Sequence, residues 1–83
     1  MMLWLVYVRG AARPDDLLEG QDGMEIADNL FLVRSGKTRS KLYHSLKRKV
    51  QPDGLLVAPL SEPPKFKGMH AGALKWLRSE THD

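Results

Sequence analysis

Lysine and arginine side chains gather in one segment of this chain, residues 34–50. The segment holds seven basic residues and no acidic one: Arg34, Lys37, Arg39, Lys41, Lys47, Arg48 and Lys49. Cations at this density repel one another unless anions lie close by, and phosphate groups are the common anions that bind several Lys and Arg side chains at once. The pattern therefore predicts contact with nucleic acid or another polyanion.

The start of this segment adds groups that favour an anion. Ser35 and Thr38 precede an amphipathic run, so either hydroxyl can cap a helix whose N–H groups attract negative charge. The tripeptide from Gly36 to Thr38 is also typical of nucleotide-binding loops. Such a loop requires a glycine five positions before Gly36, where this chain has Phe31. The sequence thus predicts an anion contact here and no nucleotide-hydrolysing loop.

A second basic motif lies at residues 65–67, where Phe66 stands between two lysines. An aromatic ring in this setting can stack on an unpaired base while the lysines bind phosphates. In the alternative, Phe66 anchors its loop to the core, an arrangement that the two preceding prolines favour. We expect the contact surface to comprise these residues, the last three being auxiliary: Arg34, Ser35, Lys37, Thr38, Arg39, Lys41, Lys47, Arg48, Lys65, Phe66 and Lys67.

Acidic residues gather in a different segment, residues 10–29. This segment has one basic residue and six acidic ones: Asp15, Asp16, Glu19, Asp22, Glu25 and Asp28. Their spacing matches no calcium-binding loop. The segment could fold over the basic helix, or join it in a neighbouring copy, which leaves open whether the basic residues are available to a polyanion.

Nothing in the sequence predicts an enzyme. The chain has no cysteine, and its three histidines, at positions 44, 70 and 82, do not have the spacing of metal ligands. None of them stands beside a recognisable nucleophile and orienting carboxylate. We therefore expect no catalytic residues, no cofactor and no metal.

Length and composition limit the architecture. Residues 1–83 are enough for a single domain with a modest core. The first apolar run, residues 1–8, is too short to span a membrane and lacks the features of a signal peptide. The sequence therefore predicts a cytoplasmic protein with no membrane role.

Apolar patterning predicts seven elements. Residues 3–8 read as a buried strand, residues 14–20 as a short helix, and residues 24–27 and 30–33 as a hairpin, with an alternative in which residues 20–29 are simply loop. A stripe of Leu42, Leu46 and Val50, with Tyr43 beside it, indicates an amphipathic helix. Residues 55–58 then form a strand, and residues 69–80 a last helix.

This order predicts an α/β (α+β) fold, namely a small ferredoxin-like βαββαβ sheet with a degenerate first helix, one long basic helix and an extra C-terminal helix. The first and third strands would be central neighbours. Pro59 places the last strand at an edge, because proline cannot donate to a central ladder. A three-stranded sheet with two helices is the alternative.

The sequence leads to two functional hypotheses. The first is a non-catalytic domain that binds nucleic acid or another polyanion through the basic helix. The second is a protein-interaction or assembly module, a homo-oligomer or a partner-binding domain, with no role in nucleic-acid binding. An open sheet edge and the separation of acidic from basic residues favour the second hypothesis.

Overall fold

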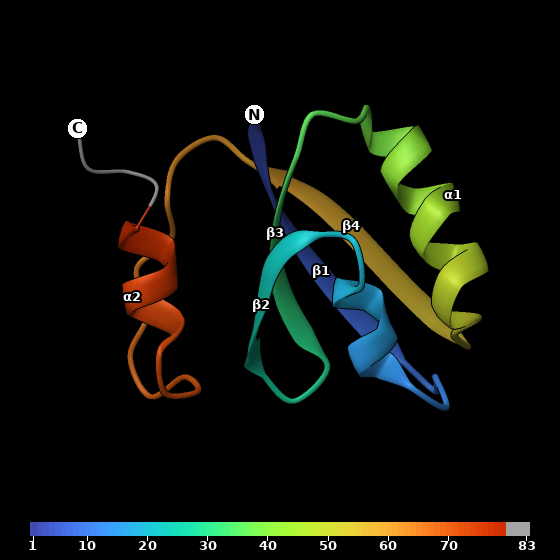
Figure 1. Cartoon of the computed structure of the whole chain (residues 1–83), viewed down its shortest axis with the longest axis horizontal. Coiled ribbons are helices and arrows are strands. Elements are labelled where there is room, and N and C mark those ends of the chain that lie inside the picture. The colour runs from blue at the N-terminus through green and yellow to red at the C-terminus, as the bar shows by residue number, and fades with distance from the viewer. Residues whose placement is uncertain (80–83) are drawn as a thin grey trace.

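The computed structural model describes residues 1–79, which form a small α+β domain with a four-stranded antiparallel sheet and two α-helices (Figure 1). The elements follow in this order: β1 (Met2–Arg9), the 3₁₀ helix η1 (Pro14–Leu18), β2 (Asp22–Ala27), β3 (Leu30–Ser35), α1 (Arg39–Val50), β4 (Gly54–Leu60) and α2 (Ala73–Arg78). The predicted succession of strands and helices is confirmed, including the hairpin.

The sheet has the strand order β2-β3-β1-β4, and each neighbouring pair is antiparallel. β1 and β3 are therefore the central strands, as predicted, and the three-stranded alternative is wrong. Leu5 in the middle of β1 lies opposite Leu32 of β3 and Ala58 of β4. The central position explains why residues 3–8 are apolar on both sides of the strand, since both faces of this part of the sheet bear packed side chains.

One face of the sheet is covered by α1 and η1. Every second residue of β1, beginning at Trp4, points to this face and packs against the apolar stripe of α1. The indole N–H of Trp4 donates to the carbonyl oxygen of Ser35 over 3.3 Å. The core on this side consists of Trp4, Val6, Val8, Leu17, Phe31, Val33, Leu42, Leu46 and Val50.

The opposite face of the sheet is covered by α2 and the loop that leads to it; in Figure 1 they lie on the left of the sheet and α1 lies on the right. The buried residues of this second core are Ile26, Leu32, Ala73 and Leu77. Half-buried side chains pack around them: Leu3, Leu5, Met24, Leu30, Leu60, Phe66, Met69 and Trp76. The two faces thus have separate cores joined by the sheet.

Local signals determine where α1 and the hairpin begin and end. Of the two candidate caps, Thr38 is the N-cap of α1, and its Oγ1 accepts a hydrogen bond of 3.2 Å from the N–H of Lys41. Gln51 ends the helix in the left-handed conformation with φ of 46°, and its N–H donates to the carbonyl of Lys47. In the hairpin turn Asn29 adopts φ of 62°, which asparagine tolerates.

The last helix is shorter than its apolar pattern predicts. It begins at Ala73 rather than at residue 69, because the N–H of His70 donates to the carbonyl of Ile26 in β2 and Gly72 has φ of 86°. A residue with positive φ cannot lie inside a right-handed helix. The predicted end at residue 80 lies outside the described residues. None of the helices within residues 1–79 has both the length and the apolar character that crossing a membrane requires.

The N-cap gives a direct test of the α1 boundary. Thr38→Ala removes the acceptor for the Lys41 N–H and should lower the free energy of unfolding by about 1 kcal/mol. Urea denaturation followed by circular dichroism measures this loss. The matched control is Ser40→Ala, since Ser40 is equally exposed and forms no cap; equal effects in both variants would contradict the assignment.

Candidate polyanion-binding surface

Five exposed cations lie on or just before α1. They are Lys37, Arg39, Lys41, Lys47 and Arg48, which we call the basic face. Burial of Leu42, Leu46 and Val50 against the sheet fixes the rotation of the helix about its axis, so Lys41 and Arg48 project away from the sheet. The apolar stripe, whose position the sequence predicted, is thus what positions the cations.

Lys49 has a different environment from the basic face. Its side chain is half-buried, and its Nζ donates to the carbonyl oxygen of Glu19 beyond η1. Lys47 stays exposed, with Nζ 6.0 Å from the centroid of the Tyr43 ring. Tyr43 is only half-buried and also meets the ring of His44 edge-on at 5.2 Å. An aromatic ring therefore borders the basic face, whereas the helical pattern assigned it to the core.

Hydroxyl groups at the start of α1 bond to the backbone. The Oγ of Ser35, which is 7% exposed, accepts from the N–H of Lys37 over 3.1 Å, and Thr38 Oγ1 caps the helix. Both hydroxyl groups stabilise the backbone conformation at the start of α1, and they thereby position Lys37 and Lys41. The N–H groups of Arg39 and Ser40, at the first two helical positions, have no intrahelical acceptor. An anion approaching this end would meet two cations and two N–H groups.

A shallow depression adjoins the helix start. It is lined by Met1 and residues 20–22 on one side and by residues 34–38 and Lys41 on the other. Asp22 brings a carboxylate to this depression, and its side chain is 50% exposed. The depression therefore has mixed charge, whereas the outward side of α1 is purely basic.

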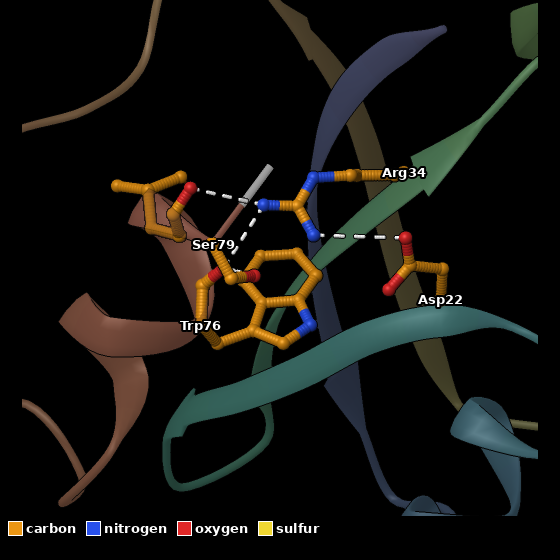
Figure 2. Close-up of polar contacts among 5 residues, drawn as sticks. Asp22, Arg34, Trp76 and Ser79 are labelled. Atoms are coloured by element: carbon orange, nitrogen blue, oxygen red, sulfur yellow. Dashed lines mark hydrogen bonds and ion pairs between the residues drawn. The ribbon is translucent and has the colours of Figure 1, made fainter. Parts of the chain in front are cut away.

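Arg34, a predicted contact residue, is placed on the opposite face of the sheet and holds α2 (Figure 2). Its Nη2 donates to the carbonyl oxygens of Trp76 and Leu77, both over 3.0 Å, and its guanidinium lies 3.8 Å from the centroid of the Trp76 ring. Nη1 lies 3.6 Å from a carboxylate oxygen of Asp22 and has no hydrogen-bond acceptor among the described residues. The side chain of Arg34 is 10% exposed. It donates hydrogen bonds to carbonyl groups in the last turn of α2, where a helix has few N–H donors of its own.

The auxiliary motif at residues 65–67 is also separated from the basic face. Phe66 is half-buried and packs with the second core, as the anchoring alternative described, while Lys65 and Lys67 are exposed. This core lies on the α2 side of the sheet. The structure therefore divides the predicted site residues between two faces and brings only those of residues 35–48 together.

The acidic segment does not pair with the basic face. Within residues 1–79 Asp22 forms an ion pair with Arg34, and a carboxylate oxygen of Asp28 lies 3.4 Å from Nε2 of His70. Glu25 accepts a hydrogen bond from the N–H of Asn29 in the hairpin turn. Asp16 lies near Lys49 at the C-terminal end of α1, which leaves the rest of the helix uncovered. In the described part of the chain no cluster of three or more His, Asp or Glu side chains could hold a metal ion.

The Arg34 contacts predict a specific loss of order. Arg34→Met keeps much of the side-chain volume but removes two charge-assisted hydrogen bonds, and should lower the free energy of unfolding by about 2–3 kcal/mol. Hydrogen exchange should accelerate at residues 73–79 more than at residues 42–50. Lys37→Met serves as the control, because Lys37 is exposed and bonds only through its backbone; unchanged protection of α2 in Arg34→Met would refute the assigned role.

Comparison of the chain with family models, curated proteins and solved structures finds no match.

Proposed function

We propose that this protein binds nucleic acid, or another polyanion, through the basic face and without catalysis. One observation carries the proposal: the five cations of this face have no carboxylate partner among residues 1–79, although six acidic residues precede them in the chain. Unpaired cations on one side of a helix raise the local potential and attract phosphates.

The mechanism would be neutralisation of phosphates with release of their counterions. Lys41 and Arg48 lie two helical turns apart, a separation of roughly 10 Å along the axis, so they can reach different phosphates. The free N–H groups at Arg39 and Ser40 add a short-range contact at one end. These groups recognise backbone and charge, so we expect little preference for base sequence.

The other predicted residues take supporting roles in this proposal. Ser35 and Thr38 shape the helix start through their backbone hydrogen bonds. Arg34 is engaged by α2 and contributes no phosphate contact. Residues 65–67 stay auxiliary, because a polyanion on α1 would have to pass the end of the sheet to reach them. The proposal keeps the cytoplasmic location expected from the sequence.

We also infer that the fold is a reduced member of the ferredoxin-like class. The strand order β2-β3-β1-β4 supports this inference, as does the succession of strand, short helix, hairpin, long helix and strand. In this interpretation η1 stands where the class has its first α-helix, and α2 is an addition that covers the other face of the sheet.

Binding should be detectable with a labelled oligonucleotide and should weaken as salt is added. If three or four phosphates are neutralised, the logarithm of the association constant should fall against the logarithm of the salt concentration with a slope of about −3. Fluorescence anisotropy between about 50 and 200 mM salt measures this slope. Lack of binding at low salt would refute the proposal, and so would an affinity that ignores salt.

Substitutions on α1 test the assignment of the surface. The double variant Lys41→Gln/Arg48→Gln should bind more weakly and lose up to about two units of the salt slope, since each cation releases about one counterion. The matched control is Lys75→Gln, because Lys75 is exposed on α2, across the sheet from α1. If Lys75→Gln weakens binding about half as much as the double variant, in proportion to the charge removed, the attraction is due to net charge and not to the basic face.

A further inference from the structure

The α2 side of the sheet is only partly covered. Tyr7 and Leu56 are register neighbours on β1 and β4, and they remain 43% and 50% exposed. We call them the apolar pair. Large apolar side chains that stand together on an open sheet face indicate an interaction surface. Neither side chain belongs to the two cores, so the fold itself makes no use of them.

A cavity with a mixed lining lies on the same side of the sheet, at the other end of its strands. Its volume is about 570 Å³. Met1, Met2, Leu3, Leu60, Pro63 and Leu77 form its apolar walls, and Asp22, Arg34, Ser61 and Glu62 form the polar part of its lining. Leu3 precedes Tyr7 by four residues on β1, so the cavity and the apolar pair are separated by roughly 13 Å along the strand. This surface therefore has the exposed apolar pair at one end and the cavity at the other.

Opposite charges flank the two ends. Arg9 follows Tyr7 on the same side of β1, and its guanidinium crosses Gly54 of β4, where a Cβ atom would lie 3.0 Å from Cζ of Arg9. Glu62 lines the cavity at the other end. Both side chains are exposed, and neither forms an ion pair within residues 1–79. Arg9 therefore lies beside the apolar pair, and Glu62 lies at the cavity, where the other two charged side chains, Asp22 and Arg34, pair with each other.

We propose that a second copy of this chain packs face to face on this surface, about a two-fold axis perpendicular to the strands. The rotation reverses the strand direction, so the apolar pair of one copy meets the cavity of the other and Arg9 meets Glu62. Leu5 and Ala58, midway between the two ends, face their own counterparts at the axis. Each contact occurs twice, as an isologous interface requires.

Charge complementarity identifies a second copy as the occupant. The surface is complementary to itself in both shape and charge, which an unrelated partner would match only by coincidence. Its mixed charge also argues against an anionic membrane surface. Because α1 lies on the other face of each sheet, the dimer would present two basic faces outward, and its formation would not depend on polyanion binding.

Sedimentation velocity of the full chain across micromolar concentrations tests the dimer. The wild type should shift from monomer to dimer as its concentration rises.

Leu56→Asp introduces a charge at a half-exposed position and should raise the dissociation constant of the dimer at least tenfold. Its circular dichroism spectrum and its oligonucleotide binding should be unchanged. The matched control is Lys67→Glu, outside the proposed contact, which should dimerise as the wild type does. A wild type that stays monomeric at all concentrations overturns the proposal, as does a dimer indifferent to Leu56→Asp.

A charge exchange tests the two-fold geometry. Arg9→Glu alone sets two carboxylates against each other at both symmetry-related contacts of the dimer, and Glu62→Arg alone sets two guanidinium groups against each other there. Both variants should dimerise at least tenfold more weakly than the wild type. Mixed together they should form a heterodimer, in which each of the two contacts joins a carboxylate to a guanidinium group, so the mixture should dimerise more tightly than either variant alone. The double variant Arg9→Glu/Glu62→Arg restores an opposite pair at both contacts and should dimerise as the wild type does. Failure of the double variant to restore dimers refutes the proposed axis.

Discussion

The apolar character of both faces of β1 is the constraint on which the rest of this structure depends. The strand has apolar side chains on both of its sides, and it is central in the sheet, so two layers must cover it. The twelve-residue α1 and η1 cover one side. The other side receives a helix of only six residues and the loop that precedes it. The two layers are therefore unequal, and this inequality leaves Tyr7 and Leu56 exposed.

A short helix needs an anchor, and here a buried arginine supplies it. Removing a guanidinium from water is costly unless its N–H groups find acceptors. Two carbonyls of α2 accept hydrogen bonds from Nη2, whereas Nη1 has an ion pair with Asp22 but no hydrogen-bond acceptor among the described residues, and the ring of Trp76 lies against the guanidinium. The same contacts neutralise the carbonyl end of the helix. Arg34 thus connects β3, β2 and α2, and only 10% of its side chain is exposed.

The sequence predicted the elements whose signals are local. The apolar run of β1, the turn at Asn29 and the stripe from Leu42 to Val50 each involve residues close together in the chain, and the helix cap was narrowed to Ser35 or Thr38. It also predicted the central pairing of β1 with β3, because the order of elements allows few arrangements. The start of α2 was missed, since a hydrogen bond to Ile26 from a distant segment overrides the helical pattern.

The roles of individual basic side chains were harder to predict from the sequence than the positions of the helices and strands. Arg34 and Lys37 are equivalent in the sequence, yet one is engaged by carbonyls more than forty positions away and the other is exposed. Strand alternation does contain a usable signal, because Arg34 and Ser35 must point to opposite faces of the sheet. Phe66 packs with the second core, which is the alternative that the two prolines before it favoured. The apolar pair was likewise missed, because the coverage of β1 depends on the length of α2.

The pairing of β1 with β4 has a consequence for the newly made chain. β1 and β3 can associate once residues 30–35 have left the ribosome, but the second edge of β1 finds its partner only when residues 54–60 follow. Until then an apolar strand with unpaired N–H and C=O groups is open to neighbouring chains. The twelve residues of α1 are synthesised in this interval, because α1 lies between β3 and β4 in the chain.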